Sequence, residues 1–326
     1  MTIVEEGPWV DPDALEPFSL QEMVAKYRHG GSSAALGRPA IAYAEGRCVG
    51  GSTEINSGLY HRLPVELAQE WRETYRIDEF TPDALERYAD RIEDELSVSR
   101  LPGAPPPSSA ILERGAVKLG WRAVEFARVF RYEHGGRAVK QTMARTFLPR
   151  AIEGRGARRA RLPRRPAASP TATGWPAPAA SARARTGRPK PLTIRSDHVF
   201  VCAGAIQTPA LLQRSGVRRN VGRGLKMHAT VKIAARFPHP IDHGDVPMHR
   251  VTEFAPSLTI GGSASRRGHV AMALADSAAD YRDALAHWEH VAVYYAAMPQ
   301  RGVGPRRRPP PAARAARDLP TSPRPT

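Results

Sequence analysis

The sequence predicts a mixed α/β fold, α+β overall, in which part of an open α/β sheet is accompanied by part of an antiparallel sheet. Three observations support this class. A short β-branched run at Thr2–Gly7 ends in two acids and a turn, as a strand does at its carboxyl end. A continuous apolar run at Val199–Cys202 leads into small residues, which is typical of a strand buried on both faces. Alternating segments at Thr230–Phe237 and His269–Leu274 indicate antiparallel strands.

The first half of the chain has one well-marked helix. The stretch Gly30–Gly58 is rich in Gly and Ser, so an extended loop region is expected there. A helix is predicted over Thr81–Val98, because Thr81 can cap it and Pro82 suits its first position. The other elements expected here are a helix over Ser108–Leu119, a strand over Val124–Tyr132 and a short helix or turn over Thr146–Ile152.

In the second half of the chain, predicted helices and strands begin again after a segment of different composition. The predicted buried strand Val199–Cys202 leads to Ala203, Gly204 and a helix with Thr208 and Pro209 at its start, ended by Gly216. Besides the two alternating segments, we expect a helix over Ala278–Trp288 and a strand over Val291–Ala297.

The formal net charge of +16 is concentrated in two segments. Residues 155–191 carry +10 and residues 301–326 carry +6, so acids and bases balance over the rest of the chain. Arg, Ala and Pro fill 26 of the 37 positions between 155 and 191, a composition that cannot bury a core. The basic character therefore belongs to two segments and not to a folded surface.

Cysteine usage and hydropathy indicate a cytoplasmic protein without a membrane span. Cys48 and Cys202 are the only cysteines, far apart and in no metal-type spacing, which argues for a reducing compartment. No stretch approaches the roughly 18 apolar residues of a transmembrane helix. The eleven histidines match no compact ligand motif, so no metal site is predicted.

The first distinctive motif is the run Glu45–Gly58, which reads EGRCVGGSTEINSG. The adjacent Gly50 and Gly51 let the backbone pass close to a bulky anionic ligand, and successive amides with the Ser52 hydroxyl can donate to phosphate or ribityl oxygens. Taken alone, such a run is also typical of an ordinary tight turn.

The second motif is Val201–Gly216, in which the predicted buried strand meets a small-residue turn and a helix. This order brings a helix N-terminus to the carboxyl end of the strand, where open α/β sheets bind cofactors. The alternative is an ordinary strand-to-helix connection with Gly216 as the helix terminator.

Together and in this order, the two runs resemble the two signature regions of the glucose–methanol–choline (GMC) oxidoreductases. The segment Asn220–His228 is similar to the family's continuation of the second signature, and the acid and glycine of Val4–Gly7 fit the end of the family's second strand. Long-chain or fatty alcohol oxidase-like members are the most similar branch, on Gly50–Asn56 and Thr146–Ala151. The resemblance implies an incomplete Rossmann-like FAD-binding domain with part of an antiparallel-sheet substrate domain.

The resemblance also implies FAD as cofactor and an alcohol as substrate, a long-chain alcohol included, with hydride passing from the alcohol carbon to the flavin. Glu5 would hold the adenosine ribose. The backbone at Gly50, Gly51 and Ser52 would lie along the pyrophosphate and ribityl chain. Asn56, Ser57 and Gly58 would sit beside the isoalloxazine ring, and Ala203 and Gly204 would approach the adenosine side.

Two family features have no counterpart in this sequence. The opening Gly-x-Gly-x-x-Gly turn and the C-terminal catalytic His pair are both missing, so we expect a fragment truncated at both ends, with no catalytic residue, that binds FAD weakly and is inactive. One hypothesis is that residues 155–191 and 301–326 are out-of-frame translations of GC-rich coding sequence.

The domain organisation expected from these comparisons has five parts. They are a partial FAD-binding domain with a helical insertion (1–154), a disordered or frameshifted linker (155–191), a second FAD-domain segment (192–228), a partial substrate-binding domain (229–300) and a disordered basic tail (301–326).

Two alternatives to a flavoprotein stay open. A basic protein could bind nucleic acid through the two Arg-rich segments, although only Trp175 places an aromatic among those arginines and no nucleic-acid partner is expected. A non-catalytic remnant that binds a partner would leave no mark in the sequence.

Overall fold

The computed structural model describes residues 2–37, 40–133, 137–154, 158–161, 167–168, 178–182, 190–194, 196–241, 248–275 and 277–298. The chain divides into two compact units. The first contains Met1–Arg161 and His228–Pro299, and the second contains Leu162–Met227 and Gln300–Thr326. Each unit is described by itself.

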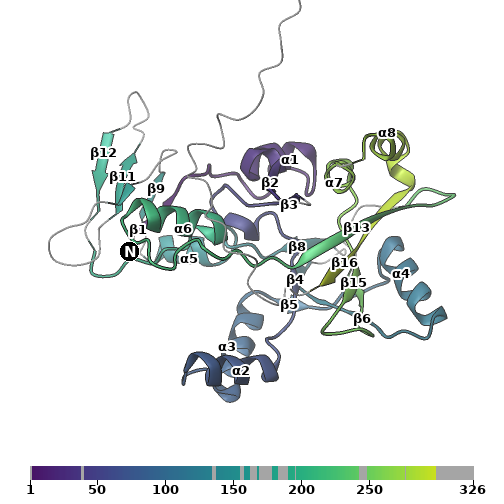
Figure 1. Ribbon diagram of the computed structural model, residues 1–326, viewed down its shortest axis with the longest axis horizontal. Coiled ribbons are helices and arrows are strands. Elements are labelled where there is room, and N and C mark those ends of the chain that lie inside the picture. Colours follow the sequence, from purple (N-terminus) through teal and green to yellow (C-terminus); the bar gives the residue numbers. More distant parts are fainter. Residues whose placement is uncertain are drawn as a thin grey trace, which may run out of the picture. The chain divides into compact units, whose positions relative to one another are not determined.

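A five-stranded antiparallel sheet forms the centre of the first unit (Figure 1). Its longest strands pair along their full lengths, since Ala229 lies opposite Met298 and Arg236 opposite Val291. The strand order is β13 (Ala229–Arg236), β16 (Val291–Met298), β15 (Thr259–Gly262), β14 (His249–Val251) and β6 (Ala123–Glu125).

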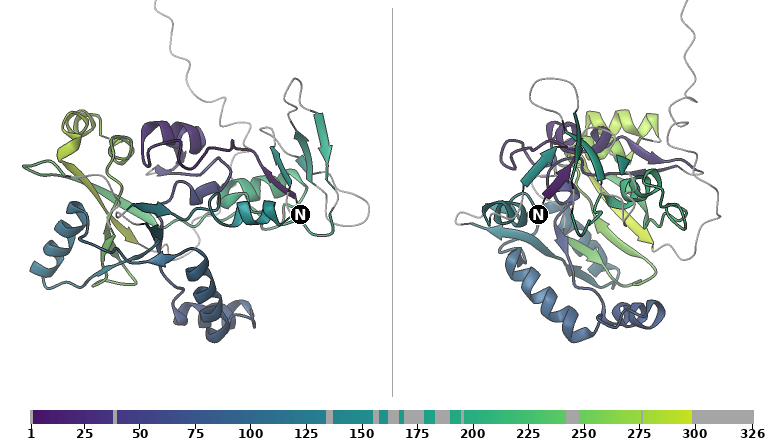
Figure 2. Two further views of the ribbon diagram at one scale, coloured as in Figure 1. Left: turned by 180° about the vertical axis from the view of Figure 1, so that it is seen from behind. Right: turned by 90° about the vertical axis from the view of Figure 1, so that its left-hand side faces the viewer.

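Helices cover both faces of this sheet (Figures 1 and 2). Successive residues of a strand point to opposite faces, so β16 contributes to two apolar clusters. Val291 and Val293 pack against residues of α7 (Arg267–Ala273) and α8 (Ala278–Ala286). On the other face, Ala292 and Tyr294 pack against residues of α4, which spans Pro107–Lys118. The predicted strand over Val291–Ala297 is therefore confirmed as a central element of the core.

The first unit also contains a set of smaller elements. Two of them pair far-separated parts of the chain: β1 runs parallel to β9, with Thr2 opposite Arg158. The elements are β1 (Thr2–Glu5), α1 (Leu20–Lys26), η1 (Arg28–Gly31), β2 (Ser33–Ala35), β3 (Ile41–Tyr43), η2 (Gly51–Thr53), β4 (Leu59–Tyr60), β5 (Val98–Ser99), β7 (Ala127–Tyr132), β8 (Ala138–Lys140), α5 (Phe147–Glu153), β9 (Arg158–Arg161) and η3 (Trp288–His290).

Helices α2 (Val65–Tyr75) and α3 (Pro82–Glu95) form a hairpin whose two members lie side by side in both figures. The predicted start of α3 is confirmed, because the Thr81 side chain accepts a hydrogen bond from the Ala84 amide. Its apolar stripe is partly open to solvent, with Tyr88 64% and Ile92 42% exposed. Helix α2 was not predicted.

The second unit contains a three-stranded antiparallel sheet and helix α6, which spans Gly204–Arg214. The helix ends as predicted at Gly216, whose φ is +87°. The amides of Gly216 and Val217 bond back to the carbonyls of Gln213 and Leu212, the pattern of a glycine-terminated helix. The sheet has the order β10 (Ala167–Ala168), β11 (Pro178–Ala182) and β12 (Lys190–Thr193).

The predicted buried strand at Val199–Cys202 is wrong. These residues form no strand, and Phe200 is 87% exposed. A strand buried on both faces needs paired strands beside it, and no described segment pairs with this run. Helix α6 also begins earlier than expected, at Gly204, so that Pro209 lies inside it.

Two further predictions in the first unit need correction. The alternating run His269–Leu274 lies mostly in helix α7, because its Ala, Met and Leu residues favour helix and Val270 packs into the core cluster. The single strand expected over Val124–Tyr132 is two strands, β6 and β7, in different sheets. The chain changes sheets at Phe126, whose amide bonds to the Met248 carbonyl.

The predicted linker and tail fall mostly on residues that are not described. Between 155 and 191 only the strands β9, β10, β11 and the start of β12 are described, and the tail 301–326 lies outside the described residues. The five-part domain organisation therefore stays a prediction. Within the described ranges, none of the helices combines the length and the apolar character needed to cross a bilayer.

Candidate functional site

The end of strand β1 places an acid and a glycine against the Gly-rich loop. The Gly7 amide donates to Glu5 Oε1 at 2.7 Å. A Cβ on Gly7 would lie 2.3 Å from the carbonyl carbon of Arg47, so only glycine allows this contact between the two backbones. Burial raises the pKa of Glu5 above its ordinary value, against the lowering effect of the Gly7 hydrogen bond.

The Gly-rich loop folds back on itself over Gly46–Ser52. The Gly46 amide donates to Ser52 Oγ at 3.0 Å. A Cβ on Gly46 would lie 2.5 Å from the carbonyl carbon of Gly51. Gly50 and Gly51 adopt φ values of +100° and +59°, which favour glycine. The loop is therefore shaped by its glycines at the positions that the sequence singled out.

Some backbone amides of the loop have no hydrogen-bond partner among the described residues. The amides of Gly50, Ser52 and Ser57 take no part in the hydrogen bonds of the described residues. A Cβ on Gly51 would meet nothing within 4 Å, so the backbone there faces open space. The Thr53 hydroxyl, in contrast, donates to the Gly50 carbonyl at 2.7 Å and is used inside the loop.

The loop ends in a second tight contact at Asn56–Gly58. The Gly58 amide donates to Asn56 Oδ1 at 3.1 Å, and Gly58 has a φ of +66°. A Cβ on Gly58 would lie 2.5 Å from the ring of Phe130 on strand β7. Asn56 is exposed while Gly58 is buried, so the segment runs from the surface into the unit.

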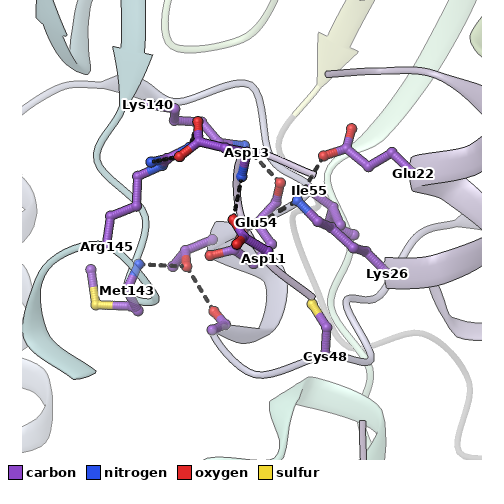
Figure 3. A network of polar contacts seen from close by, with 12 residues as sticks. Asp11, Asp13, Glu22, Lys26, Cys48, Glu54, Ile55, Lys140, Met143 and Arg145 are labelled. Atoms are coloured by element: carbon purple, nitrogen blue, oxygen red, sulfur yellow. Dashed lines mark hydrogen bonds and ion pairs between the residues drawn. The ribbon is translucent and has the colours of Figure 1, made fainter. Parts of the chain in front are cut away.

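A network of buried charges lies beside the loop (Figure 3). Lys26 Nζ on α1 lies 2.9 Å from Glu22 Oε1 and 3.4 Å from Glu54 Oε2, and all three side chains are at most 7% exposed. Glu54 packs against the inner side of the loop, because its carboxylate occupies the place that a Cβ on Gly50 would need. Sequence reasoning missed this network. The Glu22–Lys26 spacing is also that of an ordinary solvated helix pair.

A second lysine, Lys140 on β8, contacts the backbone of the same residue, Glu54 (Figure 3). Its Nζ donates to the carbonyl oxygens of Glu54 and Asn56, each at 2.8 Å. Burial lowers the pKa of Lys140 to about 8.

Burial also raises the pKa of the Cys48 thiol to about 12, so this cysteine is a protonated, unreactive core residue.

The two predicted site residues of the second motif, Ala203 and Gly204, lie in the second unit. Ala203 is the N-cap residue of α6, and Gly204 has a φ of +83°. Both residues are exposed. The first unit thus brings Glu5 and the loop residues together, while the role of Ala203 and Gly204 stays a prediction.

One other group of residues has the composition of a hydrolytic triad. Ser109 Oγ lies 2.8 Å from His249 Nδ1, and His249 Nε2 lies 3.5 Å from Glu113 Oε1. Ser109 is fully buried, however, and its oxygen accepts the amides of Met248 and His249 at 3.2 and 3.0 Å. No substrate can reach it, so the group joins α4 to β14 and is not a nucleophile.

A Ser109→Ala variant is expected to lose about 1–3 kcal/mol in the free energy of unfolding, because two buried amides would lose their acceptor. Urea denaturation measures this loss. Ser196→Ala, which removes an exposed hydroxyl, serves as the matched control and is expected to change stability by less than about 0.5 kcal/mol. Equal stabilities of the two variants would contradict the structural role of Ser109.

Among the described residues, no three His, Cys, Asp or Glu side chains gather in a way that could hold a metal ion. The site that emerges is a glycine-shaped loop with open amides beside a strand-end acid. A mixed α/β fold with such a loop is typical of dinucleotide-binding oxidoreductases.

Comparison with known proteins agrees with this class. Residues 23–230 match the family model described as GMC oxidoreductase, and the chain belongs to that family. An uncharacterized GMC-type oxidoreductase, y4nJ, of Sinorhizobium fredii is 38% identical over 315 residues, which cover 93% of this chain and 62% of that protein. The long-chain-alcohol oxidase FAO4A of Arabidopsis thaliana is 24% identical over 250 residues, 72% of this chain and 34% of that protein.

A solved structure shows the same fold. The crystal structure of pyridoxine 4-oxidase from Mesorbium loti superimposes with a TM-score of 0.57 at 16% identity, over 91% of this chain and 66% of that one. The family and fold class predicted from the two Gly-bearing motifs are confirmed. The chain spans 62% of the length of y4nJ and a third of the alcohol oxidase, so the activity of a whole GMC protein comes to this chain only as a proposal.

Proposed function

We propose that this chain carries the FAD-binding part of a flavin-dependent alcohol oxidoreductase. The observation that carries the proposal is the set of open amides at Gly50, Ser52 and Ser57 beside the strand-end acid Glu5. A dinucleotide presents phosphate oxygens and ribose hydroxyls, and these are the groups that open amides and a carboxylate can bind.

The residues present fit this cofactor. With the Gly7 amide on Oε1, the second oxygen of Glu5 is available to accept a ribose hydroxyl. The backbone at Gly50, Gly51 and Ser52 would lie along the pyrophosphate and ribityl chain, with the Gly50 and Ser52 amides as donors, and Asn56, Ser57 and Gly58 would lie beside the flavin ring. FAD, when bound, supplies the acceptor for the hydride of the alcohol carbon.

The substrate and location are proposed on separate grounds. Similarity to a long-chain-alcohol oxidase supports an alcohol substrate, long-chain alcohols included. The two unpaired thiols, Cys48 and Cys202, support a reducing compartment such as the cytoplasm. The alternative of nucleic-acid binding through the Arg-rich segments gains no support from the site or from the relatives.

FAD and FMN titrations of the purified full chain, followed by flavin fluorescence, test this proposal. FMN lacks the adenosine that Glu5 would contact. A Glu5→Gln variant is therefore expected to weaken FAD binding about 10- to 100-fold and to leave FMN binding unchanged, since hydrogen bonds to a charged group are worth about 1.5–3 kcal/mol. Glu70→Gln, an exposed acid on α2, is the matched control and should bind both flavins as the unaltered chain does.

Two results would overturn the proposal. If the unaltered chain binds neither flavin, the loop is not a flavin site in this protein. If Glu5→Gln weakens FMN and FAD binding equally, Glu5 acts on the fold and not on the adenosine ribose.

A further inference from the structure

Lys140 is the one described lysine whose ammonium group spans two carbonyls of the Gly-rich loop. Its donation to the Glu54 and Asn56 oxygens, each at 2.8 Å, brackets Ile55. The Ile55 carbonyl in turn accepts the Tyr27 hydroxyl at 3.3 Å. Three consecutive carbonyls of the loop are therefore held by side chains from β8 and from the end of α1.

These bonds act on the segment that would face the flavin. Asn56 is followed directly by Ser57, whose amide is open, and by Gly58, whose amide depends on the position of Asn56 Oδ1. Lys140 also touches Gly58 from the side, since a Cβ on that glycine would lie 3.3 Å from Lys140 Cδ. A shift of the Lys140 amine would therefore change the orientation of Asn56, Ser57 and Gly58.

The charges around Lys140 come from two elements. Helix α1 contributes Glu22 and Lys26, and the loop contributes Glu54. The two carboxylates favour the charged amine, while burial and Lys26 disfavour it more strongly. The two loop carbonyls supply hydrogen bonds that an ammonium group removed from water needs.

We propose that Lys140 is a positioning residue: the two hydrogen bonds from its amine to the Glu54 and Asn56 carbonyls hold Asn56, Ser57 and Gly58 in their flavin-facing shape. This inference rests on the proposed function for its consequence on flavin, but not for its effect on the loop. The ammonium group has three protons and can donate to both carbonyls at once, whereas methionine at this position could donate to neither.

Hydrogen exchange of the flavin-free chain at neutral pH, read by mass spectrometry, tests the loop. The peptide containing residues 54–58 is expected to lose about tenfold in protection in Lys140→Met, because two loop carbonyls lose their donor. Lys140→Arg, which keeps the charge and the donor protons, should restore most of this protection. Lys118→Met, at an exposed lysine on α4, should follow the unaltered chain.

The visible circular dichroism of added FAD gives the second readout. The unaltered chain and Lys140→Arg should induce the same flavin signal, and Lys140→Met should induce a weaker one. Exchange of residues 54–58 in Lys140→Met that equals that of the unaltered chain overturns the positioning role. A loss of protection in Lys140→Met with no flavin signal in any variant overturns the proposed function instead, and with it the flavin-facing role of the segment.

Discussion

A Lys26→Met variant is expected to lose about 3–5 kcal/mol in the free energy of unfolding, the range found when one partner of a buried ion pair is removed. Lys26 is 3% exposed, and its ammonium lies between the carboxylates of Glu22 and Glu54. Methionine fills a similar volume, so the loss would come from leaving two buried acids close together without their shared cation. Lys140 cannot take over, because its ammonium group is bonded to carbonyl oxygens.

Urea denaturation of three variants separates charge from packing. Lys118→Met makes the same chemical change at an exposed site and should cost less than about 0.5 kcal/mol. The double variant Lys26→Met with Glu54→Gln should be more stable than Lys26→Met alone, because one of the two unpaired charges is removed. If the double variant is less stable than the single one, the network is held by packing and not by its charges.

Local signals in the sequence predicted much of the fold. The start of α3 follows from Thr81 and Pro82, which act within one turn of the helix. The strand β16 follows from its unbroken apolar run, and the end of α6 from Gly216. Each of these signals concerns residues that are neighbours in the chain, so no knowledge of the tertiary structure is needed to interpret them.

The failures concern features that depend on distant partners. The run Val199–Cys202 has the composition of a buried strand, but burial requires paired neighbours that a local pattern does not report. The run around Val270 alternates like a strand and still forms a helix, since its residues favour helix and short runs fit both periods.

In the candidate site, too, the features set by local sequence were predicted and those that depend on distant residues were not. Its glycines were predicted because Gly-Gly and positive φ go together in the local chain. Its buried charges were not, because Lys26 and Lys140 reach Glu54 across 28 and 86 residues of sequence. A buried lysine has no mark that distinguishes it from a solvated one, so the network emerges only when α1, β8 and the loop are placed together.

The largest effect on the loop itself is expected from Gly46→Ala. The new Cβ would lie 2.5 Å from both the carbonyl carbon and the oxygen of Gly51, and 2.7 Å from the Ser52 nitrogen. Backbone atoms cannot rotate away as the end of a side chain can, so the two limbs of the loop must separate. Overpacking of this kind costs about 1–3 kcal/mol in stability, and the Gly46–Ser52 hydrogen bond would be lost with it.

Two matched glycines separate the clash from other effects of adding a methyl group. Gly51→Ala meets no neighbouring atom but keeps a φ of +59°, so it should cost about 1–2 kcal/mol through backbone strain alone. Gly115→Ala, inside α4 with open space around it, should gain roughly 0.5–1 kcal/mol.

Flavin titration of the same three variants connects the clash to the proposed function. Gly46→Ala displaces the limb of the loop that carries the Gly50 and Ser52 amides, which would donate to the cofactor. FAD affinity should therefore fall by about 100-fold or more, as for the loss of two hydrogen bonds of about 1.5 kcal/mol each. FMN affinity should fall with it, because the ribityl and phosphate contacts are shared by both flavins. This common loss contrasts with the FAD-specific loss expected for Glu5→Gln. A Gly46→Ala protein that folds and binds both flavins normally would mean that the fold-back of the loop is not what presents its amides to a ligand.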